Sequence, residues 1–299
     1  MVYFQTKLRE DIDINKLNFI LLSRNPNAIE ILKNNLNKVD SYYLSLNPNA
    51  IELLKDNPHK IDWYSLSRNP NAIELLKTNL DKIKWFELSK NINCLEILKD
   101  YQDNIEWFYL SSNSIAINFI KNNIDKINWT ELSCNSAAID LLKNNPEKID
   151  WNELSANPSA IELLKNNPDK INWKKLSFNT NPKAIKLLKS NLDKIKWSYL
   201  SGNPNAIELL NENQDKIDWD NLSLNPNAIE LLKENQDKID WDNLSLNPSI
   251  FTYPYKEIKE NFEILGEEII QKSLHPKRML RLMELYGEEE IYKCYFDEY

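Results

Sequence analysis

Serine has the most regular position of any reactive residue type in this chain, and a serine hydroxyl can act as a nucleophile. The serine always follows a leucine, in a Leu-Ser dipeptide that starts at Leu22, Leu44, Leu66, Leu88, Leu110, Leu132, Leu154, Leu176, Leu200, Leu222 and Leu244. A nucleophilic serine needs a base beside it, and the chain has only two histidines, His59 and His275. We therefore expect these hydroxyls to form hydrogen bonds at helix ends.

Other reactive side chains do not form a set with the spacing of a metal or redox site. The three cysteines, Cys94, Cys134 and Cys294, are far apart and odd in number, which fits a reducing compartment better than a disulfide framework. Neither histidine has metal-ligand companions nearby in the sequence. Adjacent pairs such as Asp81-Lys82 are typical of a solvated polar turn. The sequence thus predicts no enzyme activity, no cofactor and no metal.

Charge and hydropathy exclude two further classes of partner. The net charge is −8 and the pI about 5.1, so the chain lacks the basic field that collects phosphates, and nucleic acid is not expected as the primary ligand. No run of about 18 apolar residues predicts a membrane span. The first residues, MVYFQTKLRED, lack the apolar core of a signal peptide. We expect an intracellular protein.

A repeat of 22 residues accounts for the unusual composition of 3 Gly and 9 Trp in 299 residues. Successive Leu-Ser dipeptides are 22 residues apart, except that 24 residues separate Leu176 from Leu200. The unit reads L-S-x-N-P-N-A-I-E-L-L-K-x-N-x-D-K-I-D-W-x-x. Every tryptophan lies three residues before the leucine, and this column predicts a structural core: Trp63, Trp85, Trp107, Trp129, Trp151, Trp173, Trp197, Trp219 and Trp241.

Each unit is predicted to form two short helices. Asn69 is a suitable N-cap for the first helix, with Pro70 at its first position and an apolar stripe after it. This helix is expected to end near Asn79, because asparagine tolerates the left-handed conformation of a helix C-terminus. The second helix begins after an N-cap such as Asp62 and carries the tryptophan.

Stacked helix pairs bury the apolar faces that one pair cannot bury alone. We therefore predict an all-α fold: a right-handed-type α-solenoid of ten 22-residue two-helix repeats with a C-terminal helical cap. Layers about 8–10 Å apart would make an elongated array of roughly 80–100 Å. The expected domains are an N-terminal cap (1–21), the repeats (22–250) and a C-terminal helical cap or docking module (251–299). Two extra residues between Leu176 and Pro182 should bulge from one edge without breaking the stack.

The unit N-P-N-A-I-E-L-L-K-x-N-x-D-K-I-x-W-x-x-L-S resembles tandem repeats in uncharacterised proteins of giant double-stranded DNA viruses of the mimivirus kind. The resemblance covers roughly residues 19–250, and the segment Ser-Leu-His-Pro-Lys-Arg (273–278) is also similar to a C-terminal motif of such proteins. The N-P…E-L-L core is similar to the leucine-rich variant repeat, which alternates α- and 3₁₀-helices. These resemblances imply a solenoid of viral origin and no known catalysis.

Columns that vary between repeats are expected to face solvent or a partner. The two positions after the tryptophan are aromatic in early repeats and predict a partner-binding strip: Tyr42, Tyr43, Tyr64, Phe86, Phe108 and Tyr109. In the alternative reading, these rings pack beside the short helix and complete the core. In later repeats the same positions carry Asn152, Glu153, Asp220, Asn221, Asp242 and Asn243, which predict an acidic strip.

These features favour a non-enzymatic scaffold that binds a protein partner of unidentified kind. One alternative is a structural component of a virion or another assembly. A second alternative is an adapter that recruits host machinery through residues 256–299. The resemblance to viral repeats places each of these in the host cytoplasm or the virion.

Overall fold

The computed structural model describes residues 6–254, 258–259, 266–267 and 274–286, and nearly all of the regular structure among them is helical. This confirms the predicted all-α repeat fold. The chain divides into two units, one of residues 8–251 and one of residues 1–7 with 252–299, and each is described by itself. The strands of the described residues are two residues long, and β1 (Lys7–Leu8) pairs with β2 (Phe251–Thr252).

Most repeats contain three helical elements, one more than the sequence predicts. In one repeat these are α6 (Ile73–Lys77), the 3₁₀-helix η4 (Leu80–Lys82) and α7 (Trp85–Leu88). The additional element is the 3₁₀-helix, which forms over the polar Asp-Lys turn. Short 3₁₀-helices commonly serve as such connectors.

The odd-numbered helices begin at the tryptophan position: α1 (Phe19–Leu22), α3 (Ser41–Leu46), α5 (Trp63–Arg68), α9 (Trp107–Ser111), α11 (Trp129–Cys134), α13 (Trp151–Leu154), α15 (Trp173–Ser177), α17 (Trp197–Ser201), α19 (Trp219–Leu224) and α21 (Trp241–Leu246). The even-numbered helices follow the N-P-N segment: α2 (Ile29–Lys33), α4 (Ile51–Asp56), α8 (Leu95–Leu98), α10 (Ile117–Lys121), α12 (Ile139–Lys143), α14 (Ile161–Lys165), α16 (Pro182–Lys189), α18 (Ile207–Asn211) and α20 (Ile229–Glu234). The 3₁₀-helices are η1 (Ile14–Lys16), η2 (Leu36–Lys38), η3 (Pro58–Lys60), η5 (Gln102–Asn104), η6 (Pro146–Lys148), η7 (Pro158–Ala160), η8 (Pro168–Lys170), η9 (Leu192–Lys194), η10 (Gln214–Lys216), η11 (Gln236–Lys238) and η12 (Pro248–Ile250).

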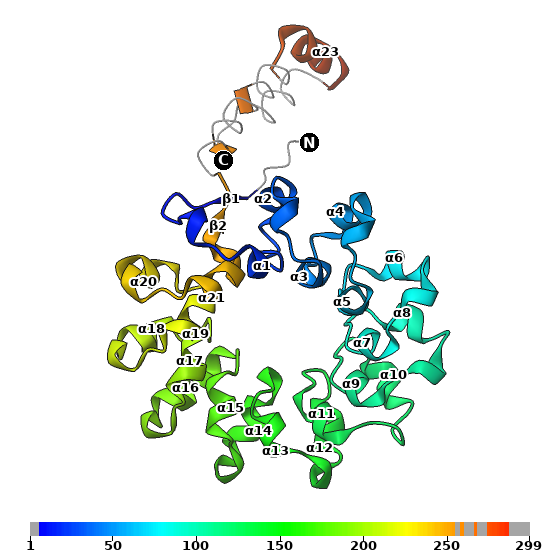
Figure 1. The fold of residues 1–299 in the computed structure, drawn as a ribbon, viewed down its shortest axis with the longest axis vertical. Helices are drawn as coiled ribbons and strands as arrows, with labels where there is room; N and C mark the ends of the chain where they lie inside the picture. The colour runs from blue at the N-terminus through cyan, green and yellow to red at the C-terminus, as the bar shows by residue number, and fades with distance from the viewer. Residues whose placement is uncertain (1–5, 255–257, 260–265, 268–273, 287–299) are drawn as a thin grey trace. The chain divides into compact units, whose positions relative to one another are not determined.

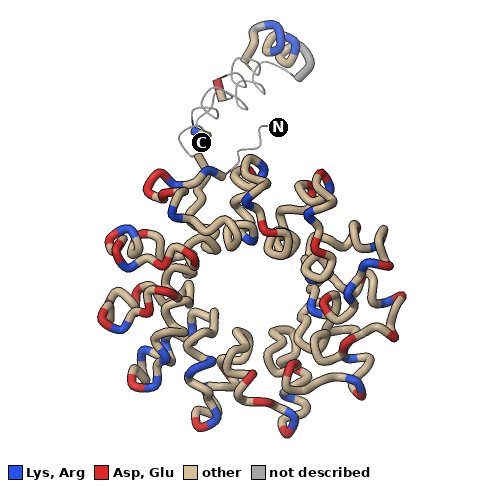
Figure 2. Tube along the Cα trace, in the orientation of Figure 1, with Lys and Arg blue, Asp and Glu red and all other residues tan. Residues whose placement is uncertain are grey.

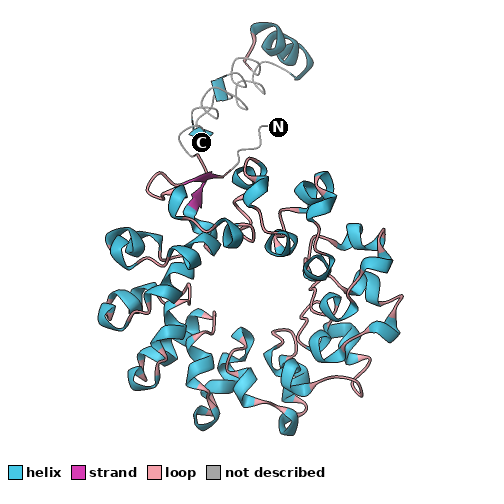
Figure 3. Ribbon diagram, viewed as in Figure 1, coloured by secondary structure: helices cyan, strands magenta, loops and turns pink. Residues whose placement is uncertain are grey.

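Within the unit of residues 8–251, the odd-numbered helices form an inner layer and the even-numbered helices an outer layer (Figure 1). Short loops join them, as the secondary-structure colouring shows (Figure 3). The core lies between the layers. The leucine of every Leu-Ser dipeptide is 0% exposed, and so is the alanine of the N-A-I segment. Cys94 replaces that alanine in one repeat and is also fully buried.

Buried asparagines join each repeat to the one before it. The Asn47 side chain donates from Nδ2 to the carbonyls of Ser23 (3.0 Å) and Asn25 (2.8 Å), and its Oδ1 accepts from the Asn49 amide. One side chain therefore satisfies two buried carbonyls of the neighbouring repeat and one amide of its own. Corresponding bonds to the preceding repeat recur at Asn69, Asn91, Asn135, Asn157, Asn179, Asn203, Asn225 and Asn247.

The repeated serines and aspartates also have structural roles. Ser67 Oγ donates to the Trp63 carbonyl (2.7 Å) and accepts from the Lys84 amide of the next repeat (2.9 Å). This confirms the predicted hydrogen bond at the helix end. Asp62 is the predicted N-cap of α5, and its Oδ1 accepts from the Ser65 amide (2.8 Å).

The asparagine at the end of each outer helix works differently from the prediction. Asn57 and Asn79 have φ of −131° and −139°, so neither adopts the left-handed conformation. Instead, each side chain donates from Nδ2 to the carbonyl four residues earlier, Leu53 or Leu75, at 2.9 Å. The amide side chain satisfies a carbonyl that the helix end leaves open.

The tryptophan column lies at the edge of the core. All nine rings are partly buried and pack against the core cluster, whereas the leucines of the Leu-Ser dipeptides are fully buried. In several repeats a lysine of the next 3₁₀-helix covers the outer face of the ring. Lys170 Nζ, for example, is 4.5 Å from the Trp151 ring centroid and Lys238 Nζ is 4.4 Å from that of Trp219.

The repeats close into a ring, which corrects the predicted elongated array. Helix α1 packs against α21. Asn25 donates from Nδ2 to the carbonyls of Ser245 and Asn247, both at 3.0 Å, and the Asn18 amide donates to Ser245 Oγ (2.8 Å). Residues 8–21 of the predicted N-terminal cap (1–21) thus contact the last repeat as any repeat contacts its neighbour.

The two-residue insertion does not interrupt the stack, as predicted. Asn203 still donates to the Ser177 and Asn179 carbonyls across the insertion, at 3.1 and 2.9 Å. In the second unit the described helix α23 (Pro276–Tyr286) agrees with the helical character predicted for residues 251–299. Much of the remainder of that predicted helical cap lies outside the described residues.

Candidate functional site

The inner helices expose one face of variable residues, which we name the inner wall. It consists of the second, third and sixth positions of each repeat, counted from the tryptophan position. The first, fourth and fifth positions pack outward, toward the core. At 100° per residue the two sets lie on opposite sides of a helix. The inner wall therefore faces away from the outer helices.

The aromatic strip predicted from the sequence lies on the inner wall of α3, α5, α7 and α9. Tyr42, Tyr64, Phe86 and Phe108 are 43–47% exposed, while Tyr43 and Tyr109 are half-buried. Edge-to-face contacts join Tyr42 to Tyr43 and join Tyr109 to both Phe86 and Phe108. Within the described residues, none of the six rings belongs to the core cluster. The strip is thus open to solvent, and its binding of a partner stays a prediction.

An ion pair that the sequence analysis missed lies within the aromatic strip. Glu87 is 3% exposed and accepts from Lys90 Nζ at 2.6 Å. The same ammonium group is 4.1 Å from the Phe86 ring centroid and 4.5 Å from that of Tyr109. A hydrogen bond to Glu87 raises the pKa of Tyr64 above its usual value. The Glu-x-x-Lys spacing was visible in the sequence, but the rings around it come from two different repeats.

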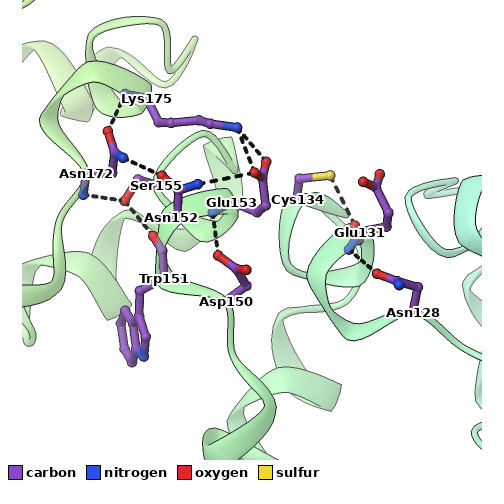
Figure 4. A network of polar contacts seen from close by, with 10 residues as sticks. All are labelled: Asn128, Glu131, Cys134, Asp150, Trp151, Asn152, Glu153, Ser155, Asn172 and Lys175. Carbon is purple, nitrogen blue, oxygen red and sulfur yellow. Dashed lines mark hydrogen bonds and ion pairs between the residues drawn. The ribbon is translucent and has the colours of Figure 1, made fainter.

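A polar network occupies the inner wall farther along the chain (Figure 4). Lys175 Nζ donates to both carboxylate oxygens of Glu153, at 2.8 and 2.7 Å. Figure 4 shows the Trp151 ring pointing away from this pair, toward the core side of the helix. Burial raises the pKa of Glu131, and the nearby charge of Glu153 adds to that effect.

The predicted acidic strip is interrupted. Asp220 and Asp242 are exposed at their predicted positions, but Lys174 and Lys175 occupy the equivalent places on α15. The inner wall therefore changes around the ring from aromatic, through mixed polar, to acidic. Charges of both signs also surround the outer rim (Figure 2), where Glu-x-x-Lys pairs such as Glu52–Lys55 lie 2.8 Å apart.

The described cysteines and histidines do not form a reactive centre. Burial raises the pKa of the Cys94 thiol to about 12 and that of Cys134 to about 11, which keeps both protonated and unreactive. His59 and His275 are both exposed, on η3 and just before α23. Among the described residues, His, Cys, Asp and Glu nowhere group in a way that could hold a metal ion. No helix of the described part has the length and apolar character to cross a bilayer.

Comparisons with protein-family models, with curated proteins and with solved structures find no match to this chain. The class of protein that the fold defines is therefore an all-α repeat ring, and functional arguments depend on its inner wall.

Proposed function

We propose that this protein is a non-enzymatic repeat scaffold that binds a protein partner through the aromatic strip of its inner wall. One observation carries the proposal. Four rings at the same position of consecutive inner helices, Tyr42, Tyr64, Phe86 and Phe108, each expose more than two fifths of their surface. Large clustered apolar patches of this kind are typical of protein interaction sites.

The physical advantage of the strip is its rigidity. Burying an aromatic ring removes about 150–250 Å² from water, so half-exposed rings in a row offer a large favourable area. The inner helices hold these rings through buried asparagine and serine bonds. A preordered surface loses little conformational entropy when a partner binds. An apolar helix or loop of the partner fits this surface best.

Charge at the margin of the strip favours an acidic border on that partner. Arg68 is exposed on the inner wall at the end of α5, beside the rings. Within the described residues it has no ion pair, whereas Lys90 is already neutralised by Glu87. A partner carboxylate near its apolar segment would therefore pair with Arg68. The viral origin and a location in the host cytoplasm or virion are part of this proposal and rest on the repeat motif alone.

Affinity purification with mass spectrometry from the native host cell tests the proposal. The full-length chain is compared with the double variant Tyr64→Ala, Phe108→Ala. The matched control is Ile115→Ala, Ile124→Ala, which removes two exposed apolar side chains (58% and 47% exposed) outside the inner wall. We expect a defined set of proteins that the control retains and the strip variant loses. Retention of every captured protein by the strip variant would contradict the proposal.

A further inference from the structure

A hollow of about 560 Å³ lies on the inner wall between α13, α15 and α17, away from the aromatic strip. Its lining combines two exposed rings, Phe178 (56% exposed) and Tyr199 (41%), with an ammonium group and two side-chain amides, those of Lys174, Asn152 and Asn172. Ligand sites are typically of this size and join apolar walls to a few polar groups.

The hollow depends on side-chain size in the sixth inner-wall column. In that column Phe178 stands between two small residues, Ala156 and Gly202, where other repeats carry leucines such as Leu46 and Leu224. Gly202 has an ordinary φ of −80°, and a Cβ there would approach Asn221 O and Tyr199 O only to 3.8 and 3.9 Å. Neither the backbone nor packing requires glycine. The small neighbours leave both sides of the Phe178 ring uncovered.

Charge in the hollow indicates the charge of a ligand. Glu153 neutralises Lys175 through two short bonds. Lys174 forms no ion pair with any described residue, and its Nζ lies 4.9 Å from the Tyr199 ring centroid. The lining thus presents one uncompensated positive charge beside two aromatic rings. A monoanion with a flat apolar group matches both features.

The two amides have donor capacity for such a ligand. Asn172 Nδ2 donates to Asn152 Oδ1, and Asn152 Nδ2 donates to Glu153 Oε1 at 3.4 Å. Each amide nitrogen carries two hydrogens. The second hydrogen of each can donate to a carboxylate or carbonyl oxygen in the hollow.

We propose that this hollow binds a carboxylate attached to an aromatic group. Lys174 forms the ion pair, and Phe178 and Tyr199 contact the ring. Two sources share this chemistry: a free aromatic acid, and the C-terminal carboxylate of a peptide that ends in an aromatic residue. The site is separate from the aromatic strip, so it can fail or succeed independently of the proposed function.

Calorimetric titration of the full chain tests the proposal with three probes: phenylacetate, its neutral amide, and the peptide acid N-acetyl-Gly-Gly-Phe. We expect the acid to bind roughly ten-fold more tightly than the amide, because only the acid pairs with Lys174. Tighter binding of the peptide acid than of the free acid identifies a chain terminus as the source, and the reverse identifies a free acid. Equal binding of acid and amide, or no binding at about 10 mM, would overturn the proposal.

Three variants locate the site. Lys174→Gln should remove the preference for acid over amide, whereas Phe178→Ala should weaken both probes alike. Ala156→Leu places in the hollow a side chain that other repeats carry in this column, so it should fold and still abolish binding. Lys183→Gln, an exposed lysine on the outer helix α16, is the matched control and should leave binding unchanged. If Ala156→Leu folds and binds like the unaltered chain, the hollow is not the site.

Discussion

The interface that closes the ring differs in detail from the internal interfaces, although both use the same framework. At the closure, Asn25 donates to the last repeat as Asn47 and its equivalents donate within the ring. Lys16 lies 4.7 Å from the Trp241 ring centroid, as Lys170 lies over Trp151. The ion pairs differ in their partners: Arg9 pairs with Glu230 at 3.0 Å at the closure, whereas pairs such as Lys77–Glu96 at 2.9 Å join internal neighbours.

The comparison indicates which residues define a repeat interface. Hydrogen bonds from asparagine side chains to backbone carbonyls, and from backbone amides to serine hydroxyls, are present both at the closure and at the internal interfaces. The aromatic residue is replaceable, because α1 begins with Phe19 rather than tryptophan. The N-cap is also replaceable, because Asn18 stands where α5 has Asp62. We infer that hydrogen bonds to buried backbone groups stabilise the contact between repeats more than the packing of any single side chain does.

The largest expected effect comes from removing the buried asparagine. Asn135→Ala inside the ring leaves the carbonyls of Ser111 and Asn113 without their partner, at a cost of about 3 kcal/mol in the free energy of unfolding. Asn25→Ala at the closure should cost a similar amount. Urea denaturation followed by circular dichroism measures both. A loss for Asn25→Ala below about 1 kcal/mol, with the full loss for Asn135→Ala, would show that the ring is open in solution.

The tryptophan column should give the next largest effect. Trp151→Ala removes a half-buried ring, and about 100 Å² of lost apolar burial predicts a cost near 2–3 kcal/mol. Trp241→Ala at the closure should cost the same, because Lys16 takes the role of Lys170. Equilibrium unfolding compares them. A clearly smaller loss for Trp241→Ala would mean that the closing repeat packs less well than the internal ones.

Sequence reasoning recovered many, but not all, of the features that local rules decide. It was wrong about the conformation of Asn79 (φ −139°) and about the start of α6, which begins at Ile73 and not at Pro70. The N-cap role of Asp62 depends on one helix turn, and the burial of Ile73 and Leu76 depends on the apolar stripe of one helix. The closure was missed because it depends on a small rotation between repeats, summed around the whole ring. No single residue encodes that rotation. The elongated array followed from assuming straight stacking.

The inner wall shows the same division between local and cross-repeat effects. The positions of Tyr64 and Phe108 followed from the repeat, and their exposure agrees with a variable column. The Lys90 contact with Tyr109 could not be predicted, since it joins two repeats at a distance that only the stacked structure sets. The hollow beside Phe178 was missed for a related reason. It arises from the small residues of neighbouring repeats, which matter only when the repeats are side by side.

A smaller effect should distinguish the closure by its charge. Asn18 Nδ2 donates to Asp242 Oδ1 at 3.0 Å, so Asn18→Asp replaces this bond with two facing carboxylates. We expect a loss of about 0.5–1 kcal/mol at pH 7, which should shrink as added salt screens the repulsion. Asn128→Asp is the internal control. There the facing position holds Phe108, and a carboxylate at the N-cap of α11 should be neutral or slightly stabilising. Equal losses of stability for Asn18→Asp and Asn128→Asp would show that repulsion from Asp242 at the closure is not the cause.

The smallest expected effect concerns an internal pair of carboxylates, Glu131 and Glu153. Burial and the charge of Glu153 raise the pKa of Glu131 in the folded state above the value of about 4.3 expected in the unfolded chain. A raised pKa favours the protonated form on folding. The associated stability is therefore present below pH ~4 and lost as the pH rises through the folded-state pKa. Glu131→Gln removes the charge, so it should stabilise the protein by about a few tenths of a kcal/mol at pH 7 after solvent screening, and by nothing at pH 4.

Glu153→Gln is the matched variant for this last test, because Glu153 is paired with Lys175 at 2.7 Å. Loss of this ion pair should destabilise the protein at pH 7, an effect opposite in sign to that of Glu131→Gln. Urea midpoints at pH 4 and pH 7 measure both variants. The sign difference matters more than the size, since both carboxylates lie on the same wall and, among the described residues, only Glu153 forms an ion pair with Lys175. If Glu131→Gln destabilises at pH 7, the attraction of Lys175 outweighs the burial of Glu131 and the repulsion from Glu153. A net attraction would then hold both carboxylates of the inner wall, as Arg9 attracts Glu230 at the closure.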